Sequence, residues 1–127
     1  MTLNEFLAGN PEINEYIDVA EGIGRIRNNK RVYQLILSEF IKDTHLDIVN
    51  DEIVKGNLEE AGKNAHAVKG ISANLSMKKA YALSAELEQK LKGGELDTGL
   101  LSNVVNTVKK TKELTQILID NLENIEF

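Results

Sequence analysis

The sequence contains two histidines, and His66 is the one whose surroundings favour chemistry. Apolar and small residues recur every three or four positions from Leu58 to Leu75, which predicts a helix with one buried face. At 100° per residue, His66 lies roughly 140° from the middle of that face, so it points outward. Its neighbours on the helix surface are Gly62, Lys63, Lys69, Gly70 and Ala73. We therefore expect an exposed imidazole beside two ammonium groups and nearly bare backbone.

Such an imidazole suits nucleophilic chemistry on an anionic group. A glycine inside a helix costs about 1 kcal/mol relative to alanine, so stability does not explain Gly62 and Gly70. A nearby cation disfavours the protonated ring and leaves a neutral, nucleophilic nitrogen, and Lys69 would screen a phosphoryl group bound there. No positioned base, second carboxylate or glycine-rich phosphate loop accompanies His66, so the pattern predicts a group carrier and not a turnover enzyme. An ordinary surface histidine stays open as the alternative.

The second histidine, His45, carries no comparable pattern. It stands beside Asp43 and Asp47 in a predicted helix, and we expect a solvated surface residue. A metal site needs several converging ligands, and the sequence has no His-x-x-x-His, no repeated Glu-x-x-His and no cysteine. We therefore expect neither a metal nor a cofactor on this chain.

Composition limits the class of protein. The 127 residues suffice for one domain, and 42% of them are hydrophobic. Fifteen basic against twenty acidic side chains give a net charge of −5, which argues against nucleic-acid binding by bulk electrostatics. The first residues lack the pattern of a signal peptide, and no apolar run is long enough to span a membrane. We expect a cytoplasmic protein without membrane contact.

Helical periodicity and glycine punctuation predict the elements that position His66. Two short helices are expected at about 11–17 and 19–27, where Asp18 and Glu21 have the form of a capping box. A long helix is expected from about Asn29 to Gly56. Its apolar face changes side near residue 46, so it either bends there or is covered by a second element.

Three further helices complete the predicted fold. One runs from Asn57 through His66, and a second, capped by Ser76, ends at Gly93-Gly94. The last begins at Asp97 or Thr98 and keeps its apolar spacing over about 40 Å. Amphipathic helices with short turns predict an all-α protein, an antiparallel up-down-up-down four-helix bundle with one or two short N-terminal helices. Residues 1–127 are expected to form this single domain.

The segment from Ala65 to Leu75, AHAVKGISANL, resembles the signature of histidine-containing phosphotransfer (HPt) domains. In that family the phosphorylated histidine is followed by a small residue, an aliphatic residue and Lys-Gly. The stretch from Arg25 to Phe40 is similar to the entry into the family's second helix. Leu83, Leu87 and Glu88 match its next-helix pattern, and the glycine turn at 93–94 follows. The resemblance covers roughly residues 18–125.

The resemblance implies a phosphorelay intermediate in two-component signal transduction. His66 would be the phosphoacceptor, Lys69 its electrostatic partner and Gly70 the residue that leaves room for the partner. The partners implied are response-regulator receiver domains and possibly a hybrid histidine kinase, with Mg²⁺ on the receiver. A monomer is expected, and a non-phosphorylated helical adaptor is the alternative.

Two positions depart from the family pattern. The expected docking face lies on the helix surface around His66. The family often has glycine where Ser76 stands and a small residue where Ile71 stands; both differences bear on which partner docks. Docking is expected over the small-residue face with locally basic flanks, although ordinary solvation would equally explain the lysines. The docking residues expected are Gly62, Lys63, Ala73, Lys78 and Lys79.

Overall fold

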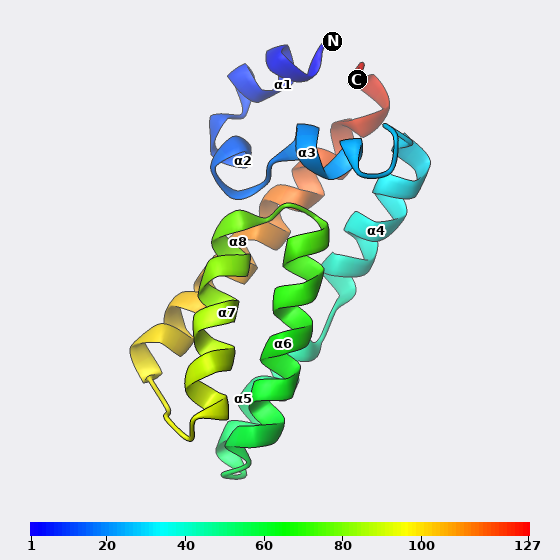
Figure 1. The fold of residues 1–127 in the computed structure, drawn as a ribbon. Helices are drawn as coiled ribbons and strands as arrows, with labels where there is room; N and C mark the ends of the chain where they lie inside the picture. Colours follow the sequence, from blue (N-terminus) through cyan, green and yellow to red (C-terminus); the bar gives the residue numbers. More distant parts are fainter.

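The chain folds into helices in the computed structural model, which describes residues 1–127 (Figure 1). No β-strand forms, so the predicted all-α class is confirmed. None of the helices is both long and apolar enough to cross a membrane. The elements are α1 (Leu3–Gly9), α2 (Pro11–Tyr16), α3 (Val19–Gly24), α4 (Lys30–Lys42), α5 (His45–Val54), α6 (Leu58–Asn74), α7 (Lys78–Lys92), α8 (Thr98–Asn121) and the 3₁₀ helix η1 (Leu122–Asn124).

Helices α6 and α7 form the front of the molecule in Figure 1, side by side and joined by the short turn of residues 75–77. Helix α5 packs against α6, and α8 packs against both α7 and α4. The short helices α1–α3 gather at one end, where the chain termini also meet. There the Met1 amino group donates a hydrogen bond to the Asn124 carbonyl at 2.9 Å. The α6–α7 pair therefore presents an outer face that the other long helices leave uncovered.

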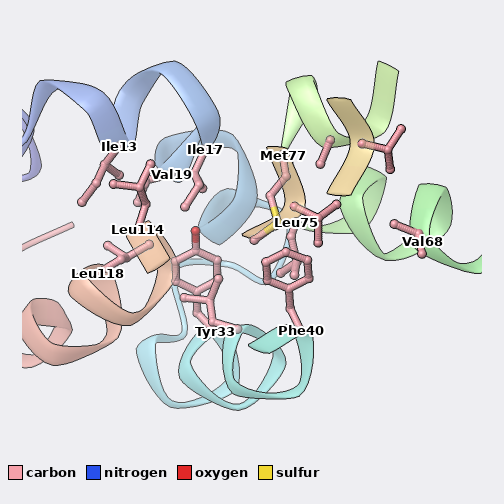
Figure 2. Close-up of a cluster of buried hydrophobic side chains, with 14 of the residues drawn as sticks. Ile13, Ile17, Val19, Tyr33, Phe40, Val68, Leu75, Met77, Leu114 and Leu118 are labelled. Carbon is pink, nitrogen blue, oxygen red and sulfur yellow. The ribbon is translucent and has the colours of Figure 1, made fainter. Parts of the chain in front are cut away.

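One cluster of buried side chains, from Phe6 to Ile125, joins the short helices to the long ones. Figure 2 shows Tyr33 of α4 in this cluster with Ile17 and Leu114, which come from the α2–α3 connection and from α8. A fully buried side chain of this size stabilises the fold by about 1.5–3 kcal/mol. The N-terminal helices are thus part of the core and hold one end of the molecule together.

Local sequence signals set most helix boundaries as predicted. Asp18, Asn29 and Asp97 each accept a hydrogen bond from the backbone N–H three residues later, which caps α3, α4 and α8. Gly56 and Gly94 each have a φ of +80°, a left-handed conformation that favours glycine, just after α5 and α7 end. These caps fix where each helix begins and ends.

Two helix boundaries near the N-terminus differ from the expectation. The sequence predicts no helix before Pro11, whereas α1 spans Leu3–Gly9 and is capped by Thr2, with a capping box between Thr2 and Glu5. Helix α3 ends at Gly24 and does not continue to about residue 27. Arg27 and Asn28 have φ values of 57° and 59°, which is incompatible with a right-handed helix.

The predicted long helix at 29–56 is broken at Asp43 and Thr44 and forms α4 and α5 instead. Asp43 is extended, and its Oδ2 accepts the His45 backbone N–H at 3.1 Å. Lys112 of α8 donates to the Asp43 backbone carbonyl at 2.8 Å, which satisfies a carbonyl at the end of α4. The change of direction expected at this point is therefore a full break and not a bend within one helix, and Val49 of α5 is buried.

The prediction that Ser76 caps the next helix is wrong. Met77 precedes α7 without a side-chain cap, and Ser76 has a φ of 55° in the turn. The Ser76 hydroxyl instead donates to Glu21 Oε1 at 3.1 Å. A left-handed backbone at this position explains why glycine would fit it with less strain.

Candidate functional site

His66 lies on the outer face of α6, as predicted. Its side chain is 61% exposed. The opposite face of α6 is buried and carries small residues, which bring α6 close to its neighbours. The buried residues of that face are Ala61, Ala65, Val68 and Ser72.

Glu88 of α7 anchors the His66 ring. The His66 Nδ1 atom lies 2.8 Å from Glu88 Oε2 and 3.0 Å from Oε1. An ionised carboxylate only accepts hydrogen bonds, so Nδ1 carries the hydrogen and donates it. The proton on Nδ1 leaves the lone pair of the neutral ring on Nε2. Nε2 is therefore the nucleophilic atom of this site.

Two lysines bind the same carboxylate. Lys69 Nζ lies 2.7 Å from Glu88 Oε1, and Lys92 Nζ lies 3.2 Å from Oε2. Burial raises the pKa of the Glu88 carboxyl, but the hydrogen bonds from Lys69, His66 and Lys92 outweigh burial and lower the pKa to about 2. Glu88 is therefore a fixed negative charge at neutral pH.

The sequence analysis gave Glu88 no role beyond a family match, although it is central to the site. Its position in the apolar stripe of α7, directly after Leu87 and three residues before Leu91, predicts a buried carboxylate. A buried carboxylate needs cationic or hydrogen-bonding partners. The signal in the sequence is this requirement, which Lys69 and His66 of the adjacent helix and Lys92 four residues later on α7 meet.

The two glycines beside His66 have different environments. A Cβ atom added at Gly70 would meet no atom within 4 Å, so this backbone faces open space. A Cβ atom at Gly62 would lie 3.0 Å from Lys92 Cγ and 3.4 Å from the Lys92 backbone nitrogen. Gly62 is buried against α7, so the expectation that it lies on an open docking face is wrong.

Lys78 and Lys79 belong to the distant end of the α6–α7 pair. The turn at Ser76 is ten residues from His66 along the chain, which corresponds to about 15 Å of helix. Both lysines bind carboxylates of the N-terminal segment, within 3.9 Å. The carboxylates are those of Asp18 and Glu21 for Lys78, and of Glu15 for Lys79. The structure therefore does not bring these two lysines to His66.

Lys63 and Ala73 lie on α6 itself. Lys63 is exposed, and its Nζ lies 3.5 Å from Glu60 Oε2. Ala73 is half-buried, and its carbonyl accepts a hydrogen bond from Arg25. Lys63 therefore remains an exposed cation one helical turn before His66, and it stays a candidate docking residue.

His45 begins α5 and is separate from the site. Its Nδ1 lies 2.6 Å from Asp43 Oδ1, and its side chain is 41% exposed. No group of three or more His, Cys, Asp or Glu side chains converges in a geometry that would hold a metal ion. His45 therefore offers an internal comparison for His66, because it is also exposed and paired with a carboxylate.

An apolar groove of about 520 Å³ lies between α4 and α6. Ile71 and Asn74 on one wall flank the next turn of α6 after Gly70. The sequence singles out Ile71 only as a departure from the family pattern, and it does not predict the groove. Its lining residues are Arg25, Ile26, Ile36, Glu39, Phe40, Asp43, Ile71, Asn74 and Leu75.

The arrangement defines an exposed nucleophile with a fixed tautomer. Nδ1 is held by a buried anion, Nε2 is free, and two ammonium groups bind the same carboxylate as the ring. No family model, no curated protein and no solved structure matches this chain. Its function is therefore inferred from the geometry around His66 and from the residue pattern that surrounds it.

Proposed function

We propose that this protein is a phosphorelay intermediate of the histidine-containing phosphotransfer type. His66 accepts a phosphoryl group from the aspartyl phosphate of one receiver domain and passes it to another receiver. The observation that carries the proposal is the exposed His66 ring, with Nδ1 on the buried Glu88 carboxylate and Nε2 free. The His-Ala-Val-Lys-Gly sequence at 66–70 supports it.

The same proposal extends to the arrangement of the long helices. Helices α4 with α5, α6, α7 and α8 would be the four members of an antiparallel up-down-up-down bundle, with the short N-terminal helices at one end. Short connections from α6 to α7 and from α7 to α8, and the contacts of α8 with both α7 and α4, support this topology. A carrier between receivers works in the cytoplasm, which we propose as its location.

The transfer needs little covalent work from this chain. The Nε2 lone pair attacks the phosphorus in line, and the bond from phosphorus to the aspartyl oxygen breaks, which returns the receiver carboxylate. The histidine ring becomes cationic while Nδ1 keeps its hydrogen, and the reverse reaction loads the next receiver. Positioning and charge stabilisation dominate such reactions, and the Mg²⁺ is expected on the receiver.

Glu88 serves this reaction in two ways. Its hydrogen bond from Nδ1 sets the ring orientation and keeps the tautomer with Nε2 unprotonated. Its negative charge then stabilises the cationic ring that forms when phosphorus binds. Lys69 and Lys92 maintain that charge, because their hydrogen bonds favour the carboxylate over the carboxylic acid.

The receiver is proposed to dock over Gly70 and the groove between α4 and α6. A Cβ atom at Gly70 would meet nothing in this chain, so the glycine is not explained by packing. It is explained by the close approach of a partner to the helix backbone beside His66. The apolar groove one turn further along α6 gives that partner an adjacent surface to bury.

The first test is phosphoryl transfer from a panel of phosphorylated receiver domains. We expect wild-type protein to gain one phosphoryl mass that is lost in acid, as a phosphoramidate bond is. His66→Gln is expected to abolish this gain and to change stability by no more than about 0.5 kcal/mol, as for a surface substitution. Intact mass spectrometry and thermal unfolding measure both quantities.

His45→Gln is the matched control, because His45 is also exposed and bound to a carboxylate. It is expected to take label like the wild type. Retained label in the His66→Gln variant eliminates the assignment. Binding of receivers without any acid-labile mass gain would favour the alternative, a non-phosphorylated helical adaptor that uses the groove between α4 and α6.

A further inference from the structure

Lys92 is close to the reactive ring although it lies on a different helix and outside the recognised sequence pattern. Its Nζ lies 3.2 Å from Glu88 Oε2, and His66 Nδ1 lies 2.8 Å from the same oxygen. The ammonium group and the ring therefore share one acceptor atom. A lysine side chain is long enough to move from that oxygen to a group bound on the ring.

Gly62 is the reason that the Lys92 side chain can lie in this position. The Lys92 Cγ atom occupies the place where a side chain at residue 62 would begin, 3.0 Å from an added Cβ. The Lys92 backbone nitrogen and Leu91 Cβ also lie close to that position, at 3.4 and 3.6 Å. The missing side chain at Gly62 lets α6 and α7 approach and lets the lysine stem lie across α6.

We propose that Lys92 is a second phosphoryl-binding cation of the His66 site and that Gly62 positions it. The inference rests on the proposed function, because it requires His66 to carry a phosphoryl group. When Nε2 is phosphorylated, Lys92 leaves Glu88 and binds a phosphoryl oxygen. Glu88 remains bound to the ring through Nδ1–H.

The charges of the loaded site favour a second lysine. The phosphoryl group brings two negative charges, Glu88 brings one, and the phosphorylated ring with Nδ1–H is a cation. With Lys69 and Lys92 both present these formal charges cancel, whereas Lys69 alone leaves one negative charge without a partner. Lys92 is also the more exposed of the two, since its side chain is 48% exposed and that of Lys69 is 27% exposed.

The test uses phosphoramidate, a small donor that needs no receiver. Nε2 attacks its phosphorus, the phosphorus–nitrogen bond breaks, and the nitrogen leaves as ammonia after it takes up a proton. We expect Lys92→Gln to slow loading of His66 and to speed loss of the phosphoryl group, each by about two- to fivefold, the range that exposed ion pairs support. High salt is expected to shrink the difference. Time courses of intact mass at two salt concentrations measure these rates.

Matched variants separate charge from structure. Lys92→Arg keeps the cation and is expected to restore both rates. Lys55→Gln removes an exposed lysine that also pairs with a glutamate, Glu52, and is expected to match the wild type. Unchanged rates in Lys92→Gln, or no loading of wild-type His66 by phosphoramidate, overturn the proposal.

Gly62 is tested by a double-mutant cycle. Gly62→Ala displaces the Lys92 stem and is expected to reproduce the Lys92→Gln rates, while the packing cost of the methyl group against α7 offsets the gain in helix propensity. In the Lys92→Gln background, Gly62→Ala is expected to add nothing, which a purely structural effect would not produce. Additive losses overturn the positioning role.

The outcome for this inference is independent of the test with receivers. A Lys92 effect with phosphoramidate, combined with no label from any phosphorylated receiver, would contradict the proposed function and keep this inference. Label from receivers without any Lys92 effect would support the proposed function and contradict this inference.

Discussion

Glu88 determines the reactivity of the His66 imidazole, because its carboxylate fixes the tautomer and the orientation of the ring and places a negative charge next to Nδ1. The sequence analysis considered only the lysines as charges near the ring, and it deduced a neutral nucleophile from their repulsion. The structure shows that Lys69 and His66 bind the Glu88 carboxylate, whereas Lys63 pairs with Glu60. The second lysine on Glu88 is Lys92 of α7, which the sequence pattern does not single out. The hydrogen bond from Nδ1 to an anion therefore leaves the lone pair on Nε2, and the lysines interact directly with that anion and not with the ring.

Glu88→Gln is expected to slow phosphoryl acceptance by His66 about tenfold or more, as expected for the loss of one charge-assisted hydrogen bond. The amide keeps the shape of the carboxylate but removes its charge. It also has an NH₂ group that can donate to Nδ1, which would move the ring hydrogen to Nε2 and remove the nucleophile. Loading rates with phosphoramidate and with phosphorylated receivers measure the effect.

The pH dependence of stability checks that the charge of Glu88 is responsible. The folded state lowers the pKa of this carboxyl from 4.5 to about 2, so folding favours its deprotonated form. The stability it contributes is complete above about pH 4.5 and is lost as the pH falls through about 2. Urea unfolding of the wild type and of Glu88→Gln should show curves that converge over this window. A constant difference down to pH 2 would contradict the assignment of the charge.

At the scale of the helix, a substitution at Gly70 is expected to affect the stability of the fold and the docking of a partner in opposite directions. Gly70→Leu is expected to stabilise the protein by about 1 kcal/mol, because leucine favours a helix and the position faces open space. The same variant should slow transfer from receivers by at least about tenfold, the effect of a docking penalty of 1.4 kcal/mol. Thermal unfolding and transfer kinetics measure the two effects.

Loading of Gly70→Leu by phosphoramidate is the control, and it should stay close to the wild-type rate because this donor is small. Unchanged transfer from receivers would remove the role of Gly70 in partner clearance. A loss of stability would show that the glycine serves packing within this chain.

Helix boundaries could be predicted where capping residues and the spacing of apolar residues agree. They could not be predicted where a contact with a distant helix sets the boundary. Asp97 and Gly94 mark helix boundaries in the sequence, and the structure follows them. The break at Asp43 depends partly on Lys112, a residue of α8 that no local pattern connects with α4. The site divides in the same way. The exposure of His66 follows from helical spacing, whereas the contact with Glu88 requires the pairing of α6 with α7.

The lysines show a further limit of sequence reasoning. The sequence predicts a role at the reactive ring for Lys69 and a docking role for Lys78 and Lys79, yet these lysines bind carboxylates in different parts of the molecule. Lys69 binds Glu88 of α7, whereas Lys78 and Lys79 bind three carboxylates of the N-terminal segment. Charge in a sequence gives the number of cations, but only the packing of distant helices decides which of them remains beside the ring.

Across the whole molecule, the core near α2 and α3 contains a polar atom that no group in the chain satisfies. The Tyr33 hydroxyl is buried without a hydrogen-bond partner. Figure 2 shows the Tyr33 side chain among Ile17, Val19 and Leu114. Burial raises the pKa of this hydroxyl, with a smaller contribution from the charge of Asp18, so it stays neutral. The ring contributes apolar burial that ties the N-terminal helices to α4 and α8, while the hydroxyl contributes only a desolvation cost.

Tyr33→Phe is therefore expected to raise the free energy of unfolding by about 1 kcal/mol, because it removes an unsatisfied buried group and keeps the ring. For a chain of this size that corresponds to a rise of about 3–5 °C in Tm. Tyr81→Phe is the control, since Tyr81 is exposed and should leave Tm unchanged. Phosphoryl loading of His66 should be equal in all three proteins, because this core is remote from Glu88. A lower Tm in Tyr33→Phe would show that the hydroxyl has a partner in the folded protein, and the core around α3 would then be held by a polar contact as well as by apolar packing.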